Sequence, residues 1–237
     1  MKDIVNYILK YYIKKYRYVA PIILFLIFLR INYSQYPMGV WNNYSFTCLV
    51  VFIFSIWISY GFFEFEDKTQ QYLAILHSKS EIRFYMSKIA ANLIFLIPLD
   101  VIVVLLPVIS KLFDRRITIG ELVAALALHL LSSLIAISVT SIVLSGIIKD
   151  KSYCIMILFS LIVLTAAKTG IISSMPYFSF LRWILPPVDI LNSELNSLGE
   201  QSVYHIDIKF LANILYELIY STILLAFYLK ITIKRLL

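Results

Sequence analysis

Between two strongly apolar runs, residues 63–88 read FEFEDKTQQYLAILHSKSEIRFYMSK, the longest polar and charged interval of this kind in the chain. The flanking runs have the length and composition of membrane spans. A polar interval with a helical periodicity of its own predicts a structured element outside the membrane. We therefore expect residues 63–88 to form a cytoplasmic element that contacts a partner.

The composition of the 237 residues is that of a membrane protein. Hydrophobic residues make up 61% of the chain and charged residues only 15%, which is too few to cover the surface of a soluble globule. The formal net charge is +7. Beside membrane segments, basic residues mark the cytoplasmic side, so this charge predicts contact with a lipid bilayer and no nucleic-acid partner.

Six apolar runs predict an all-α integral membrane protein with a single transmembrane domain. Each run is long enough, or nearly so, to cross a hydrocarbon core of ~30 Å at ~1.5 Å per residue. The runs lie at about 18–36, 45–63, 89–110, 122–147, 153–172 and 209–229. Small side chains at helical spacing in the fourth run, among them Ser138 and Ser141, predict a helix that packs on several sides.

The positions of Lys and Arg decide the predicted orientation. If the N-terminus is inside, 14 of the 21 basic residues fall on the inside. The short loop with Lys111, Arg115 and Arg116 opposes this orientation, and only the sum decides. We expect a multi-pass protein of the cell membrane with both termini in the cytoplasm.

The N-terminal residues 2–17 predict a helix that lies in the plane of the membrane surface. Charged side chains such as Lys10 and Lys14 share one helical face, and apolar ones such as Ile8 and Tyr16 share another. A plain basic flank to the first span is the alternative.

The segment between the fifth and sixth runs, residues 173–208, predicts short outer helices. Its first part is aromatic but too short to span, and Pro186 and Pro187 end it. A second candidate helix runs from Val188 to Leu198. An ordinary amphipathic loop on the outer surface is an equal alternative.

Enzyme signatures are missing from the sequence. The three histidines, His77, His129 and His205, are far apart, and no zinc-protease or serine-hydrolase motif is present. No phosphate-binding loop is present either. We expect a protein without enzymatic activity, bound metal or bound cofactor, so ATP, if it is used, must bind to another polypeptide.

Two acidic residues fall deep in predicted spans, Asp100 in the third and Glu217 in the sixth. An ionised carboxylate at mid-membrane costs about 2.5–3.5 kcal/mol on insertion scales. One interpretation is that both acids, with Asn213, line a path for a cationic or polar substrate. The other is a protonated or hydrogen-bonded acid that holds helices together, with Asn92, Asn213 or His129 as partner.

The 63–88 stretch itself predicts a short amphipathic helix over residues 64–77. Two opposite stripes follow from its periodicity. One consists of Thr69, Tyr72, Leu73 and Leu76, and the other of Gln70, Gln71, Ala74 and His77. The acidic residues Glu64, Glu66 and Asp67 suit the N-terminus of that helix.

This layout resembles the membrane subunits of ABC-type exporters of the second permease class. Such subunits have an interfacial elbow helix, six spans, a cytoplasmic coupling helix between spans two and three, and short outer helices between spans five and six. In many members the coupling loop reads Glu-x-x-x-Gly-Thr, then a Leu-rich turn, a Pro, a basic stretch and a Lys. The matching positions here are Glu64, Thr69, Leu73, Leu76, Arg83 and Lys88. Lys68 stands in place of the Gly, and His77 stands near the place of the Pro.

The resemblance implies a permease subunit that pairs with a second permease subunit, identical or different, and with separate ATPase subunits that bind ATP and Mg. The coupling helix would dock in a groove of the ATPase. The residues expected at that contact are Glu64, Glu66, Asp67, Thr69, Gln70, Gln71, Ala74 and His77.

The implied cargo is a peptide, an antimicrobial peptide or a drug that leaves the cell. The alternative is a non-transporting membrane scaffold or sensor that binds a cytoplasmic partner through residues 63–88.

Overall fold

The chain folds into a bundle of α-helices, described here from a computed structural model that covers residues 1–188 and 208–234; these residues contain no strand. The helices are α1 (Lys2–Lys14), α2 (Val19–Asn32), α3 (Val40–Phe63), α4 (Lys68–Ser78), α5 (Glu81–Ile109), α6 (Ile119–Val143), α7 (Lys151–Ser174), the 3-10 helix η1 (Pro176–Phe180), α8 (Leu181–Ile184) and α10 (Ile208–Lys234). The predicted all-α class is therefore confirmed.

Five of these helices, α3, α5, α6, α7 and α10, are long and apolar enough to cross a membrane. The shortest have 24 residues and so measure ~36 Å, more than the ~30 Å of a hydrocarbon core. The first predicted span, 18–36, corresponds to α2, which has only 14 residues. A sixth span therefore stays a prediction.

Helix α6 lies at the centre of the bundle, with α3, α5 and α10 packed against it. In its most apolar stretch 67% of the residues are buried, against 17% in α7 and in α10. Small side chains such as Ala124, Ser133 and Ser141 are almost completely buried, and they let neighbouring helices approach closely. This confirms that the fourth apolar run packs on several sides.

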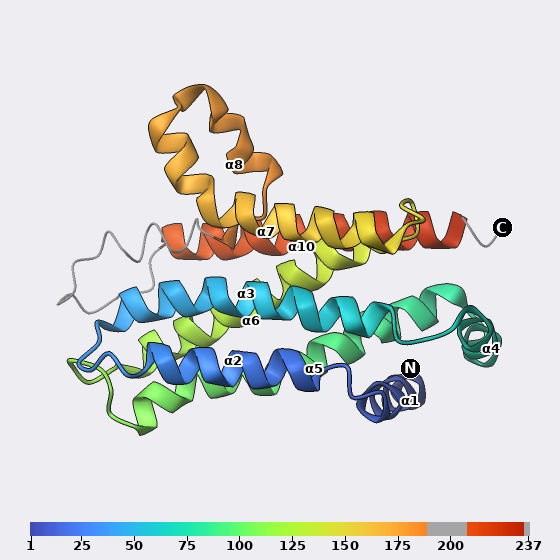
Figure 1. Cartoon of the computed structure of the whole chain (residues 1–237), viewed down its shortest axis with the longest axis horizontal. Helices are drawn as coiled ribbons and strands as arrows, with labels where there is room; N and C mark the ends of the chain where they lie inside the picture. Colours follow the sequence, from blue (N-terminus) through green and yellow to red (C-terminus); the bar gives the residue numbers. More distant parts are fainter. Residues whose placement is uncertain (189–207, 235–237) are drawn as a thin grey trace.

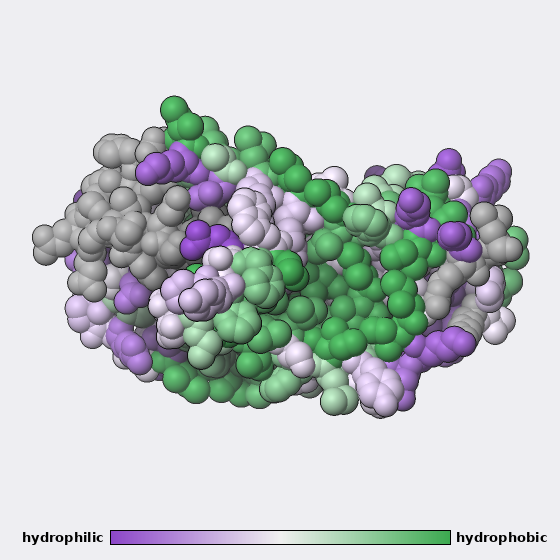
Figure 2. Space-filling view, turned by 90° about the horizontal axis from the view of Figure 1, so that it is seen from above, coloured by the Kyte–Doolittle hydropathy of each residue, from purple (hydrophilic) through white to green (hydrophobic). Residues whose placement is uncertain are grey.

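The long helices run roughly along one axis, whereas α1 and α4 lie across one end of the bundle (Figure 1). The C-terminal part of α10 lies at this same end, which we call the α4 end. Figure 2 shows a broad apolar band over the middle of the molecule, with hydrophilic residues toward both ends. A bundle that spans a membrane requires this distribution.

Helix α1 is fastened to the bundle through Tyr12. This side chain is fully buried, and its hydroxyl donates a hydrogen bond to the carbonyl of Ile58 at 3.2 Å. Burial raises the pKa of Tyr12 above its ordinary value, so the hydroxyl keeps its proton.

The helix predicted over 2–17 ends at Lys14. The chain then turns into α2 with Tyr16 in a left-handed conformation (φ 55°), which leaves Tyr16 exposed and corrects its predicted place on the apolar face.

Ordered connections also hold the opposite end of the bundle together. The amide of Asp114 donates to the carbonyl of Met38 at 3.0 Å. Glu121 forms a capping box with Thr118 at the start of α6 and accepts two hydrogen bonds from Arg115, at 2.6 and 3.0 Å. The start of α6 is thereby fixed to the loop before it.

The short elements η1 and α8 project from the side of the bundle (Figure 1). Lys168 of α7 is fully buried and donates a hydrogen bond to the carbonyl of Pro186 at 3.0 Å. Helix α8 ends just before Pro186 and Pro187, as expected from their sequence positions. The second helix predicted here, Val188 to Leu198, lies beyond Val188 outside the described residues.

Cysteine labelling tests the predicted orientation and the role of α2. Gln35, Asp114 and His77 are exposed, as is Tyr16, whereas both native cysteines are buried. We expect membrane-impermeant maleimide to label Gln35→Cys and Asp114→Cys in intact cells. Tyr16→Cys and His77→Cys should react only after the membrane is opened. Labelling of Gln35→Cys and Tyr16→Cys from the same side would show that α2 does not cross.

Candidate functional site

Short connections on both sides fix α4 relative to the bundle. Residues 64–67 join it to α3, and only Lys79 and Ser80 separate it from α5. Lys79 adopts a left-handed conformation (φ 58°), which ends the helix and redirects the chain into α5. Because α4 begins at Lys68, Glu64 and Glu66 lie in the connection before it, outside the helix predicted from residue 64, whereas Asp67 is the N-cap residue and so lies at the helix N-terminus as predicted.

Lys88 of α5 is buried where α3, α4 and α5 meet. Its Nζ lies 2.9 Å from Oε2 of Glu66 and donates to the carbonyl of Phe63 at 3.2 Å. The side chains of the pair are only 3% and 1% exposed. The rings of Phe63, Phe65 and Phe84 lie 5.1 to 5.9 Å from the same nitrogen, within the range of cation–π attraction. Lys88 thus ties the last turn of α3 and the 64–67 connection to α5.

Glu64 connects the same segment to two further elements. Its carboxylate forms an ion pair with Lys151 at the start of α7. Its carbonyl accepts a hydrogen bond from Arg17 at 2.8 Å. The Lys151 side chain is 70% exposed, so solvent screens this pair much more than the buried one.

The face of α4 that lies against the bundle, its inner face, is polar. Gln70 accepts a hydrogen bond from Tyr11 of α1. Gln71 donates to the hydroxyl of Tyr85 of α5 at 3.1 Å. Ala74 packs into the apolar cluster around these tyrosines. The tyrosine hydroxyls of α1 and α5 therefore explain why the glutamine face is the one that turns inward.

The opposite face of α4 presents apolar side chains to the outside. Tyr72, Leu73 and Leu76 are 55%, 53% and 73% exposed, and Thr69 and His77 are exposed beside them. We call these five residues the outer face of α4. Tyr72 lies at the edge of this face and also lines the cavity described below. A contiguous patch of exposed apolar side chains indicates an interaction surface, whereas a single exposed apolar side chain does not.

The residues predicted to contact a partner are divided between the two sides of α4. Asp67, Thr69 and His77 are exposed. The others are partly buried or turned toward the bundle, and they are Glu64, Glu66, Gln70, Gln71 and Ala74. The exposed apolar residues Tyr72, Leu73 and Leu76 come from the other predicted stripe, of which only Thr69 was expected at the partner contact. Only the tyrosines that α1 and α5 bring to this face of α4 in the folded chain would have indicated this.

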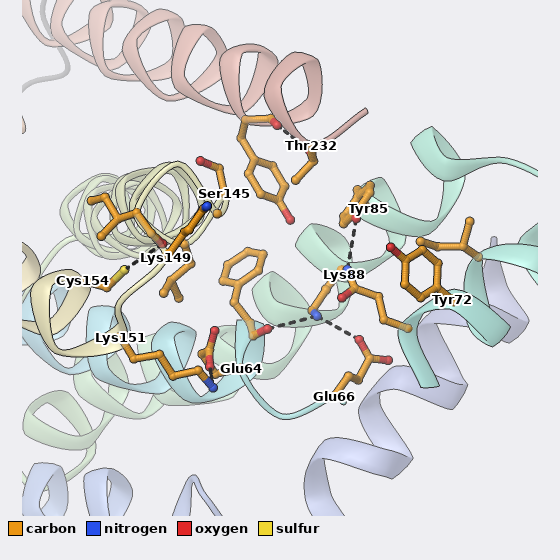
Figure 3. A pocket seen from close by; sticks show the side chains of 17 residues that line it. Glu64, Glu66, Tyr72, Tyr85, Lys88, Ser145, Lys149, Lys151, Cys154 and Thr232 are labelled. Carbon is orange, nitrogen blue, oxygen red and sulfur yellow. Dashed lines mark hydrogen bonds and ion pairs between the residues drawn. The ribbon is translucent and has the colours of Figure 1, made fainter. Parts of the chain in front are cut away.

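A cavity of about 650 Å³ lies between α4, α5, the turn after α6 and the end of α10. In Figure 3 the pair of Glu64 and Lys151 stands on one side of this space, and the pair of Lys88 and Glu66 stands on another. Thr232 of α10 lines the far wall. Helix α4 contributes Gln71, Tyr72 and Ile75 to the lining of this cavity, so its position affects the shape of the cavity.

The predicted path residues lie in the spanning part of the bundle. Asp100 of α5 and Glu217 of α10 are 1% and 2% exposed. Both acids lie near Cys48 of α3. Asn213, one helical turn before Glu217, is half-buried. The fold thus brings the two acids into one region of the interior.

Asp100 makes a direct contact between helices. Its Oδ1 accepts a hydrogen bond from Ser133 of α6 at 2.9 Å. Two partners considered from the sequence bond elsewhere, because Asn92 donates to a serine of α3 at 2.9 Å and His129 donates to a carbonyl of its own helix at 2.7 Å. The hydrogen bond from Ser133 to Asp100 favours the interpretation that Asp100 holds helices together, and a substrate path stays a prediction.

Among residues 1–188 and 208–234, no group of three His, Cys, Asp or Glu side chains could hold a metal ion.

Comparison of the chain with protein-family models, with curated proteins and with solved structures finds no match. What the α4 end does therefore has to be inferred from its own residues and their geometry.

Replacing Lys88 by Met tests the importance of the buried pair. The change leaves the Glu66 carboxylate buried without a counter-charge, and we expect a loss of about 3–5 kcal/mol in the free energy of unfolding, the usual cost of removing one partner of a buried pair. Denaturant titration of the purified protein in mixed micelles measures this loss.

The exposed pair supplies the matched control. Lys151→Met should cost only about 0–1 kcal/mol, and adding Glu66→Gln to Lys88→Met should recover part of the larger loss. Equal losses for Lys88→Met and Lys151→Met would contradict the assigned role of Lys88.

Proposed function

We propose that this chain is the membrane-spanning permease subunit of an ABC-type exporter. The observation that carries the proposal is the arrangement of α4, a short helix between two candidate spans that lies across the bundle end. Its polar face is fastened to the bundle and its apolar face points outward. A permease without a phosphate-binding loop needs an external, firmly attached element of this kind to receive energy from an ATPase.

The proposed contact with the ATPase is the outer face of α4. Tyr72, Leu73 and Leu76 would enter a groove of the partner in the manner of helix-in-groove recognition. Thr69 and His77 flank them. Glu66, which the resemblance placed at this contact, is engaged with Lys88 and instead attaches the element to the bundle.

In this proposal a force on α4 reaches the spans through three attachments. The ion pair of Glu66 acts on α5, the hydrogen bond of Gln71 acts on the same helix, and the ion pair of Glu64 acts on α7. ATP must bind one arrangement of the assembly better than the other, since a ligand shifts an equilibrium only by its differential affinity.

The proposed cargo is a peptide, an antimicrobial peptide or a drug that moves out of the cell. A second permease subunit, identical or different, would complete the route. Asp100, Asn213 and Glu217 are the polar side chains that a rearrangement of α5 against α10 would bring to the surface of that route. The orientation in this proposal places the α4 end in the cytoplasm of the cell.

Substitution of Leu73 and Leu76 by Glu tests the proposed contact. Charges in the centre of an apolar docking surface should reduce the recovery of a bound ATPase by about tenfold or more. The measurement is affinity purification of the tagged full chain in mild detergent, followed by identification of partners and an assay of ATP hydrolysis.

Ile119→Glu is the matched control, because Ile119 is 84% exposed at the opposite end of the bundle. This variant should recover the ATPase as the unchanged chain does. Recovery of a stable partner that has no phosphate-binding loop and no ATPase activity would contradict the permease and favour the scaffold or sensor. Failure of the unchanged chain to recover any ATPase would also contradict the proposal.

A further inference from the structure

A row of buried polar side chains connects the cavity at the α4 end with Asp100. In order from the cavity, its members are Lys88, Asn92, Ser59, Ser55, Ser133 and Asp100. None of them is more than 3% exposed. Such a series in the interior of an apolar bundle requires an explanation, because each polar group there loses its hydration.

Direct contacts join three neighbouring pairs of this row. Nδ2 of Asn92 donates to Oγ of Ser59 at 2.9 Å, which links α5 to α3. Oγ of Ser55 lies 3.1 Å from Oγ of Ser133, which links α3 to α6. Ser133 donates in turn to Asp100 at 2.9 Å.

The other two steps run along single helices. Lys88 and Asn92 are four residues apart on α5, as are Ser55 and Ser59 on α3, so each step rises ~6 Å on one helical face. A water molecule with two hydrogen bonds of ~2.8 Å spans ~5.6 Å, about the length of such a step.

Two buried acceptor atoms in the row receive no hydrogen bond from the described residues, and they indicate where water binds. Oδ1 of Asn92 and Oδ2 of Asp100 are buried and accept no hydrogen bond from the described residues. Buried water commonly occupies positions beside such atoms. Leu96 interrupts the polar face of α5 between Asn92 and Asp100, which is why the row passes through the serines of α3 at that level.

The charge of Asp100 has no basic partner in the described part of the chain, because none of its ion pairs includes this residue. The titratable groups that face this region are Cys48 of α3, His129 of α6 and Glu217 of α10. An uncompensated carboxylate in the membrane interior is costly, whereas a proton removes its charge.

A larger cation fits this position less well than a proton. Asp100 is 1% exposed and packed against Ser133. The cavity at the α4 end begins at Lys88, twelve residues away along α5 and so ~18 Å distant. A proton is the one cation that needs no room of its own.

We propose that Asp100 is a proton-binding site of the membrane interior, and that its proton exchanges with the α4-end cavity along this row of side chains and waters. In each exchange the Asp100 carboxyl gives its proton to an adjacent water and takes another back, so no net charge moves. The inference does not depend on the proposed transport function.

Infrared spectroscopy of the full chain in lipid bilayers tests both parts. The carbonyl stretching band of a protonated carboxyl should be present, and it should shift when the aspartate carboxyls carry ¹³C. Asp100→Asn, which keeps the shape of the side chain, should abolish that aspartate band. An aspartate band that is absent from the unchanged chain, or that persists in Asp100→Asn, would overturn the proton-binding site.

The rate at which the band shifts after transfer to D₂O tests the route. Asn92→Leu breaks the row and should slow the exchange by roughly tenfold or more, because an apolar side chain removes a hydrogen-bonded step. Asn43→Leu, the same substitution on α3 near the opposite end, should leave the rate unchanged. Equal rates in Asn92→Leu and in Asn43→Leu would overturn the route, and the isotope shift in the unmutated chain keeps the binding site testable if a variant misfolds.

Discussion

The buried ammonium group of Lys88 sets the geometry of the α4 end. A cation that is only 3% exposed must find an opposite charge and further acceptors close by. Glu66 and the last carbonyl of α3 supply them, and three phenylalanine rings enclose the nitrogen. The end of α3, the connection before α4 and the first turns of α5 therefore have one mutual arrangement. Because residues 64–67, which precede α4, are fixed in this way, α4 lies across the end of the bundle and does not move as a free loop.

The same requirement, that polar groups in an apolar bundle find partners, orders the interior. Ser133 of α6 reaches Asp100, and Ser55 of α3 reaches Ser133, because the small side chains of α6 let its neighbours approach closely. Asn92 lies one turn along α5 from Lys88, so the polar contacts of the α4 end continue toward the middle of the bundle. Movement of α5 would affect both regions together.

The sequence predicted much of the fold because hydrophobic length and helical period are local properties. It indicated the long helices, the amphipathic α1 and a short helix inside residues 63–88. It did not show which face of α4 turns inward, because that depends on Tyr11 and Tyr85, which only the fold brings to Gln70 and Gln71. It also treated Glu66 as a surface residue, since nothing local in the sequence shows that Lys88 is buried beside it. The predicted run 18–36 also extends beyond α2, because it includes residues 33–36, which follow the end of the helix at Asn32.

The rigidity of α4 on α5 is the central claim, and a distance measurement between two spin labels tests it most directly. Labels at Leu76→Cys on α4 and at Ile102→Cys on α5 occupy exposed positions, and the native cysteines are buried. In lipid bilayers the unchanged Lys88 should give one narrow distance distribution, and Lys88→Met should broaden it. A broad distribution with Lys88 in place, or a narrow one that survives Lys88→Met, would contradict the claim.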